Sequence, residues 1–388
     1  MTSLAAALAS ELAALEVEGL RRTRRVLESP QRAHVTVDGR EYVAFCSNDY
    51  LGLAAHPDLI QAACEGAQRY GVGAGASHLI LGHTEAHHAL EHALARFVDV
   101  PAGLFFSSGY MANLGVVTAL AGRGDAIFAD KLNHASLNDA ALLSKAQFKR
   151  YPHLDLGALE RLLETTRAKT KVIVSDTVFS MDGDIAPVQA LLELAVRYDA
   201  WLVLDDAHGF GVLGAAGRGI LEHAGIRSSR IAYMGTLGKA AGVYGAFVAG
   251  GRELIDTLMQ RARTYIYTTA TPPLIAHALL KSLEIIERDG ARRVHLFELV
   301  ARLKRGLHAC RWKLMPSDTP IQPLIVGGSI QAVALSARLA ERGLLVPAIR
   351  PPTVRAGTAR LRISLSAGHA VADVDKLIDG LRALQADA

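Results

Sequence analysis

Cysteine is scarce in this chain, with three residues among 388. Cys46, Cys64 and Cys310 are odd in number, far apart and without any Cys-x-x-Cys spacing. This pattern excludes a disulfide framework, which needs an even set of cysteines, and a thiolate metal site, which needs closely spaced ligands. We therefore expect reduced thiols, and a cytoplasmic location suits such a protein best.

Long apolar runs, repeats and strong charge are also missing. No run reaches the roughly 18 apolar residues that cross a bilayer. The first 18 residues combine helically spaced leucines with glutamates and no basic start, so we expect an amphipathic arm and not a secretory signal. The net charge is only +4, and the basic cluster at residues 21–25 is more typical of a solvated helix face than of a nucleic-acid site or an anionic-substrate site. We predict no membrane and no nucleic-acid partner.

What is present is an alternation of helical stretches and short apolar runs. The runs expected to form strands are 104–106, 126–128, 172–174, 202–204, 231–234 and 245–248. Such alternation predicts an α/β fold with a largely parallel sheet covered by helices.

The pattern changes near residue 285. A charged helical stretch at 284–305 leads to short segments at 323–326 and 360–364 and to a closing helix from Ala372. We therefore predict an N-terminal helical arm at 1–45, a large α/β domain at 46–285 and a smaller α+β domain at 286–388.

Two motifs follow neighbouring apolar runs. Asp205-Asp-Ala-His-Gly209 comes directly after 201–204, and Gly235-Thr-Leu-Gly-Lys239 comes directly after 231–234. A carboxylate at the carboxyl end of a strand usually faces a ligand in α/β sheets, although a turn cap would explain an isolated aspartate equally well. Pyridoxal phosphate needs a lysine amine for a Schiff base and a carboxylate that keeps its pyridine nitrogen protonated. Lys239 and Asp205 are the candidates for these two roles.

A phosphate site is predicted beside them. The segment Ser107-Ser-Gly-Tyr-Met-Ala-Asn113 follows an apolar run and opens a helix, and backbone N–H groups at a helix start bind phosphate well. Alone, the segment would be an ordinary serine-capped helix. Thr236 offers a second hydroxyl, and small residues on both sides of Lys239 leave room for a planar cofactor. We place His134 and His208 around the ring.

These motifs resemble the α-oxoamine synthase family of fold-type I pyridoxal phosphate enzymes, from about residue 40 to the C-terminus. The segments that carry the resemblance are 45–53, 133–137, 179–184, 205–209 and 349–354. It implies an aspartate aminotransferase-like fold and a homodimer with active sites at the subunit interface, where Thr268 and Thr269 reach the neighbour's cofactor.

The resemblance also implies a role for each site residue. Lys239 holds the cofactor, Asp205 pairs with the pyridine nitrogen, and His134 stacks on the ring and meets the substrate. The remaining cofactor contacts are implied for Gly109, Tyr110, Ser180, His208 and Thr236. Substrate contacts are implied for Arg362, which binds the amino-acid carboxylate, for Thr353, and for Arg21 or its neighbour Arg22.

The implied reaction is a decarboxylative condensation of L-alanine with pimeloyl-CoA or pimeloyl-acyl carrier protein, which yields 8-amino-7-oxononanoate for biotin synthesis. Segment 349–354 favours this donor over the acetyl, succinyl and long-chain thioesters of other members, and glycine or serine is the alternative to alanine. The choice of carrier stays open. Departures from the usual pattern, which bear on acyl-chain fit, stand at Ala74, Ala76, Leu81, Tyr244 and Arg355.

Two rival interpretations come from other classes of protein. His88-Ala-Leu-Glu-His92 matches the inverted zinc-peptidase pattern, but a catalytic zinc also needs a third ligand, and we favour a polar helix face with Leu90 and Leu94 turned inward. An inactive partner subunit is the other rival. The presence of Lys239 argues against it, so we predict an enzyme without a metal.

Overall fold

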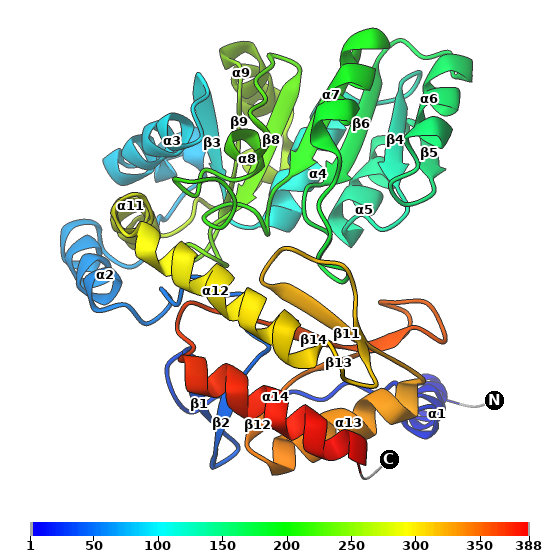
Figure 1. The fold of residues 1–388 in the computed structure, drawn as a ribbon. Helices are drawn as coiled ribbons and strands as arrows, with labels where there is room; N and C mark the ends of the chain where they lie inside the picture. The colour runs from blue at the N-terminus through cyan, green and yellow to red at the C-terminus, as the bar shows by residue number, and fades with distance from the viewer. Residues whose placement is uncertain (1–2, 387–388) are drawn as a thin grey trace. The chain divides into compact units, whose positions relative to one another are not determined.

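The computed structural model describes residues 3–386, which divide into two compact units (Figure 1). The larger unit comprises residues 49–180 and 184–294. The smaller unit takes the described residues up to 48, the short segment 181–183 and the chain from 295 onwards. The N-terminal residues that the sequence suggested as a separate arm thus belong with the C-terminal part of the chain.

The larger unit is built around a seven-stranded sheet of order β3-β9-β8-β7-β6-β4-β5. The strands are β3 (Ala102–Phe106), β4 (Ala126–Asp130), β5 (Gln147–Tyr151), β6 (Lys171–Asp176), β7 (Ala200–Asp205), β8 (Ile231–Thr236) and β9 (Ala246–Gly250). Only β9 runs antiparallel to its neighbours β3 and β8. The mostly parallel α/β sheet predicted from the sequence is therefore confirmed.

Every apolar run that was expected to be a strand lies in one of these strands. The runs are apolar because both faces of the sheet are covered, and β4 and β9 are buried along their whole length. Strand β5 was not predicted. It is an edge strand with the sequence Gln-Phe-Lys-Arg-Tyr, which stays partly exposed and so lacks the apolar signal.

Helices surround this sheet (Figure 1). They are α2 (Pro57–Tyr70), the π-helical turn η1 (His78–Gly82), α3 (Glu85–Phe97), α4 (Gly109–Leu120), α5 (Ala135–Ser144), α6 (Leu156–Thr165), α7 (Val188–Arg197), α8 (Ile220–Ala224), α9 (Arg252–Arg261), α10 (Arg263–Ile266) and α11 (Pro273–Arg288). A continuous core forms where α4, α5 and α9 pack on the sheet, with Val116, Leu137, Val203 and Leu258 fully buried within it. This core fixes the strand ends from which the site is built.

The smaller unit contains two short sheets. One has the order β1-β2-β12 and the other β10-β11-β14-β13. Their strands are β1 (His34–Val37), β2 (Arg40–Ala44), β10 (Lys313–Leu314), β11 (Ile321–Gly327), β12 (Leu344–Leu345), β13 (Ala348–Ile349) and β14 (Ala359–Ser364). Strand β14 is buried along its length although it carries two arginines, Arg360 and Arg362.

The unit's helices include α1 (Leu4–Val17), α13 (Ser329–Glu341) and α14 (Val371–Ala386), which is the expected closing helix. The predicted helical stretch at 284–305 proves to be two helices, because α11 ends at Arg288 and α12 (Gly290–Leu307) begins after Asp289. Helix α1 has the expected helical form, but none of its residues is buried. Among the described helices, none has both the length and the apolar character of a membrane span.

Candidate active site

The site lies where three adjacent parallel strands end. Strand β6 ends at Asp176, β7 at Asp205 and β8 at Thr236, and in the sheet Asp176 stands opposite Asp205. Ligands bind at this edge in open α/β sheets. The three ends face a cavity of about 200 Å³. Its lining includes every residue that the sequence assigned to the cofactor: Gly109, Tyr110, His134, Ser180, Asp205, His208, Thr236 and Lys239.

Lys239 has a histidine as its close neighbour. The Lys239 Nζ atom lies 2.8 Å from Nε2 of His208, and Nδ1 of the same ring lies 2.7 Å from the Tyr50 hydroxyl. Tyr50 is fully buried and His208 nearly so. The hydrogen bond on Nδ1 fixes the orientation of the ring, so Nε2 is held toward the cavity.

Asp205 is buried and supported by two donors. Its Oδ1 accepts from the Ala207 backbone N–H at 3.0 Å, and its Oδ2 accepts from the Asn113 side-chain amide at 2.6 Å. Donors on both oxygens favour the ionised form of a carboxylate. The buried Oδ1 of Asn113 has no hydrogen-bond partner among the described residues, and Asn113 is part of the cavity lining. A buried carboxylate and an unsatisfied amide oxygen together fit a ligand with a protonated ring nitrogen.

Asp176 is a second carboxylate in the cavity. It is buried, and its two oxygens accept from the backbone N–H of His134 at 3.2 Å each. Burial raises its pKa well above the usual value, and the nearby Asp205 raises it further. Burial and the neighbouring carboxylate therefore both favour the protonated form of Asp176.

His134 begins helix α5 and borders the cavity. Its Nδ1 lies 2.7 Å from the Ser136 hydroxyl, which itself accepts from Asn113. Although His134 is an exposed residue, desolvation by surrounding protein lowers its pKa, while Asp205 acts in the opposite direction and Lys239 in the same one. A neutral ring anchored at one nitrogen suits stacking on a flat cofactor.

The start of helix α4 provides the expected anion site. Ser108 caps the helix by accepting from the Met111 backbone N–H, and the first N–H groups, on Gly109 and Tyr110, have no partner within a helix. A Cβ atom on Gly109 would lie 2.7 Å from Cγ2 of Thr236, so only glycine fits there without displacement. The Tyr110 hydroxyl donates to Asp139, and this bond holds the tyrosine side chain beside the helix start.

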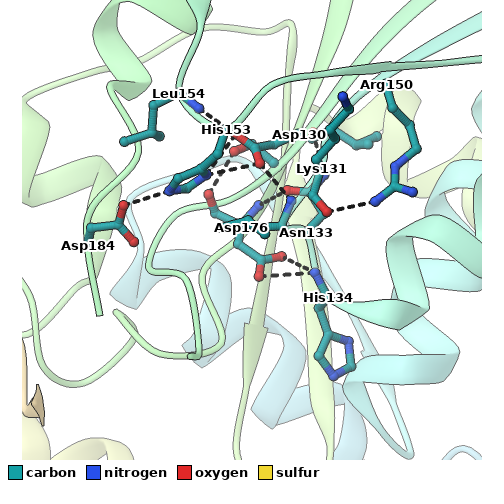
Figure 2. Close-up of polar contacts among 12 residues, drawn as sticks. Asp130, Lys131, Asn133, His134, Arg150, His153, Leu154, Asp176 and Asp184 are labelled. Carbon is teal, nitrogen blue, oxygen red and sulfur yellow. Dashed lines mark hydrogen bonds and ion pairs between the residues drawn. The ribbon is translucent and has the colours of Figure 1, made fainter. Parts of the chain in front are cut away.

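The loop that carries Ser180 is tied to the sheet by an ion-paired histidine (Figure 2). His153 Nδ1 lies 3.0 Å from Asp130, at the end of β4, and its Nε2 lies 2.7 Å from Asp184, at the end of the loop. Burial by itself would lower the pKa of His153. The hydrogen bonds and charges of the two carboxylates outweigh it and raise the pKa to about 10.

This ion pair predicts a pH-dependent contribution to stability. A pKa raised by folding stabilises the fold fully below the unfolded value of about 6.5, and the contribution is lost as pH rises through about 10. We expect His153→Gln to lower the melting temperature most near pH 6 and progressively less toward pH 10.5. Thermal melts of the wild-type and variant proteins across this pH range test the prediction. If the two melting temperatures differ by the same amount at every pH, His153 does not carry the proposed charge.

Tyr50 is expected to position His208. Tyr50→Phe keeps the ring but removes the hydroxyl on Nδ1, so we expect kcat to fall about tenfold, the effect of one buried hydrogen bond, and the pH profile of kcat to shift. Tyr151→Phe is the matched control, because it also removes a hydroxyl from a buried tyrosine, one bonded to Ser175. Equal effects on the pH profile would mean that Tyr50 serves packing alone.

Apart from His134, the substrate residues suggested by the sequence belong to the smaller unit. Arg362 is buried on β14, where its guanidinium donates to Asn48 Oδ1 at 3.2 Å and to the Ser364 hydroxyl at 2.8 Å. Arg362 is therefore not an ordinary surface arginine. Arg22 and Thr353 line one small cavity of about 100 Å³, whereas Arg21 pairs with Glu16. The geometry therefore favours Arg22 over Arg21 as the partner of Thr353.

Sequence reasoning missed several residues that complete the site. Tyr50, Asn113 and Asp176 hold His208, Asp205 and His134 respectively, and Asn48 holds Arg362. Asp176 had a readable signal, because it ends a predicted strand one place along the sheet from Asp205. The roles of Tyr50 and Asn113 depend on contacts across 158 and 92 residues, which no local pattern indicates.

The zinc-peptidase pattern does not assemble into a site. His88 and His92 are exposed on α3, with their Nε2 atoms 3.2 Å apart, whereas Glu91 is partly buried and accepts from the Phe105 backbone N–H. Leu90 and Leu94 are fully buried, as the polar-face interpretation predicted. Among the described residues, His88 and His92 therefore have no third ligand that would complete a zinc-peptidase site.

Comparison with known proteins agrees with this geometry. Residues 40–381 match the family model described as aminotransferase class I and II. An 8-amino-7-oxononanoate synthase of Nitrosospira multiformis is 64% identical over 95% of this chain and 93% of its own, and one of Nitrosomonas europaea is 64% identical over 95% and 96%. A serine palmitoyltransferase structure from Sphingomonas wittichii has a TM-score of 0.92 at 32% identity, covering 97% of this chain and 96% of its own.

A structure of 8-amino-7-oxononanoate synthase from Francisella tularensis also matches, with a TM-score of 0.78 at 31% identity over 89% of this chain and 98% of its own. Lys239, the supported Asp205 carboxylate, the unsatisfied Asn113 oxygen and the helix start at Gly109 all fit pyridoxal phosphate, the cofactor of this family. The chain therefore belongs to the aminotransferase class I and II family and, within it, to the α-oxoamine synthases.

Proposed function

We propose that the chain is an 8-amino-7-oxononanoate synthase, which condenses L-alanine with a pimeloyl thioester and releases carbon dioxide and the free thiol of the carrier. The observation that carries the proposal is the cavity around Lys239. It gathers eight cofactor residues predicted from the sequence, in a chain that is 56–64% identical to eight relatives of that name. The free cysteines and the absence of a cysteine pair support the expected cytoplasmic location.

Each residue of the cavity has a part in this chemistry. When bound, pyridoxal phosphate supplies an electron sink for the carbanion that forms at the α-carbon of alanine. The Lys239 amine accepts the α-proton, and His208 holds that amine in place through its Nε2. The Asp205 carboxylate keeps the ring nitrogen protonated, and the N–H groups that open α4 bind the phosphate.

Arg362 is proposed to bind the carboxylate of L-alanine. Its guanidinium is already oriented by Asn48 and Ser364, so it would offer a planar fork to a carboxylate at little cost in side-chain order. Lysine keeps the charge but loses the fork. We expect Arg362→Lys to raise KM for L-alanine about 10- to 100-fold, in line with the loss of one charged hydrogen bond.

The neighbouring Arg360 provides the control for that experiment. It is equally buried on β14 but is ion-paired with Asp182 at 2.8 Å. Arg360→Lys should lower the melting temperature while changing KM for L-alanine less than Arg362→Lys does. Steady-state kinetics with varied L-alanine measures both, and an unchanged KM in Arg362→Lys would remove the residue from the substrate site.

The acyl donor is proposed to be pimeloyl-acyl carrier protein or pimeloyl-CoA. Arg22 and Thr353, which share a cavity, are the proposed contacts. Of the residues that depart from the family pattern, Tyr244 and Leu81 are exposed by 51% and 84%, so they do not fill the core and remain open to substrate or to a second subunit. Purified enzyme assayed with each donor, and with acetyl and succinyl thioesters, decides the donor, and preference for a short chain would overturn the pimeloyl assignment.

A homodimer is proposed as the active form. Exposed apolar side chains gather along residues 72–81 of the larger unit, with Val72, Ile80 and Leu81 more than three-quarters exposed. Exposure of this kind marks an interaction surface. Thr268 and Thr269, the residues proposed to reach the partner's cofactor, are respectively half-buried and exposed. Light scattering during size-exclusion chromatography tests the dimer, and a catalytically active monomer would contradict it.

A further inference from the structure

Three histidines outside the active site converge where η1 meets α3. His78 begins η1, His83 follows it, and His87 lies in the first turn of α3. One ring nitrogen from each lies within 4.8 Å of those of the other two, and the ring centroids are 5.0–5.7 Å apart. His78 and His87 are buried, and His83 is half-buried.

Two of these rings already have the spacing of metal ligands. The Nδ1 atoms of His78 and His83 lie 3.1 Å apart. Two nitrogens bound to one tetrahedral zinc, each at 2.0–2.1 Å, lie about 3.3 Å apart. In the metal-free protein a single proton must be shared between these atoms, and a cation can take the place of that proton.

All three rings are neutral at physiological pH. Burial, together with the neighbouring His87 and His83, lowers the pKa of His78 to about 3. Burial also lowers the pKa values of His83 and His87. A metal ligand must offer a lone pair, and neutral imidazoles do so without a prior loss of a proton.

The hydrogen bond behind His87 is of the kind that usually orients a metal-binding histidine. His87 Nε2 donates to the Thr271 carbonyl at 2.7 Å, so its lone pair is on Nδ1, which now accepts from the Thr84 backbone N–H at 3.1 Å. His83 Nε2 lies 3.9 Å from the Glu91 carboxyl group, which is beyond hydrogen-bond distance. Backing by a carbonyl, as for His87, is a common arrangement behind zinc-bound histidine.

We propose that His78, His83 and His87 form a binding site for one divalent transition-metal ion, with Zn²⁺ as the type, through three imidazole nitrogens and a fourth position for water. Imidazole ligands without carboxylate in the inner set select zinc, nickel or copper and not magnesium or calcium. Binding releases the contact between His87 and Thr84 and joins η1, with its exposed Leu79 and Ile80, to the start of α3. The ion therefore fixes η1 and plays no part in the chemistry at Lys239.

The test is calorimetric titration of the tag-free holoenzyme, cleared of free pyridoxal phosphate, with Zn²⁺ and separately with Mg²⁺. We expect one Zn²⁺ per chain and no Mg²⁺ binding. His83→Gln and His78→Gln should each weaken Zn²⁺ binding at least tenfold, while His88→Gln/His92→Gln, which removes the exposed pair on the same helix, should leave it unchanged. The visible spectrum of the bound cofactor confirms that each variant is folded.

Loss of binding in the His88/His92 double variant, or full binding in His83→Gln, would place the ion on the exposed pair and overturn the proposal. So would the absence of a one-to-one site in the wild-type enzyme. His78 stacks on Tyr265, with ring centroids 4.9 Å apart, so we expect His78→Gln also to lower the stability of the fold. His83→Gln then decides the result alone, because that ring is only half-buried.

Discussion

Replacing Lys239 with alanine is expected to lower kcat by roughly 10⁴-fold or more, because one amine both holds the cofactor and moves the α-proton of the substrate. The visible absorbance of lysine-bound pyridoxal phosphate should also disappear. The fold should be retained, since the Lys239 side chain is half-buried and its Nζ contacts His208 and not the core. Kinetics, absorbance and a thermal melt on one preparation measure all three effects.

Lys281→Ala is the control for Lys239→Ala. It removes a lysine from the exposed surface of α11, where it pairs with Glu284, and should leave both kcat and the spectrum unchanged. A Lys239→Ala protein that kept both its visible band and more than a small part of its activity would mean that another lysine binds the cofactor.

Asp205→Asn is expected to produce the second-largest loss, about 10²- to 10³-fold in kcat, the range seen when one charge-stabilising contact is removed from an active site. Asparagine keeps the shape and accepts from Ala207, but it cannot hold a protonated ring nitrogen by charge. A change in the bound cofactor's spectrum should accompany the loss, because the ring nitrogen would lose its proton.

Asp176→Asn is the matched control, since it makes the same substitution one strand away in the same cavity. If Asp176 already holds a proton, asparagine replaces a neutral group with a neutral group of the same shape. Activity should then fall less than tenfold. A loss as large as that of Asp205→Asn would show that both carboxylates are ionised and that the two roles have been assigned wrongly.

The parts of the fold that could be predicted are those in which burial requires a run of apolar residues. Strands β4, β6, β7, β8 and β9 are covered on both faces, so each is a short apolar run. Strand β5 lies at the edge of the sheet and carries polar side chains, so it has no apolar run from which it could be predicted. The break at Asp289 was missed although Asp289-Gly290 is a pair that favours a turn, because the stretches on both sides of it are helical in pattern.

The cofactor side of the site was predictable because its residues sit at strand ends and at a helix start, positions that sequence alone identifies. The supporting contacts were not. Tyr50 on His208 and Asn113 on Asp205 join segments that are distant in the chain, and either residue taken alone reads as ordinary core. The cluster of His78, His83 and His87 was not predicted either. Its residues match no metal-binding sequence pattern, whereas the exposed His88 and His92 match the zinc-peptidase pattern.

The most direct test of the central claim follows the carbon atoms of L-alanine. The purified enzyme is given pyridoxal phosphate, a pimeloyl thioester and L-alanine labelled either at the carboxyl carbon or at the methyl carbon, and the products are analysed by mass spectrometry. We predict that the carboxyl label leaves as carbon dioxide and that the methyl label appears in 8-amino-7-oxononanoate. Labelled pyruvate in place of that product, or retention of the carboxyl label in it, would contradict a decarboxylative condensation.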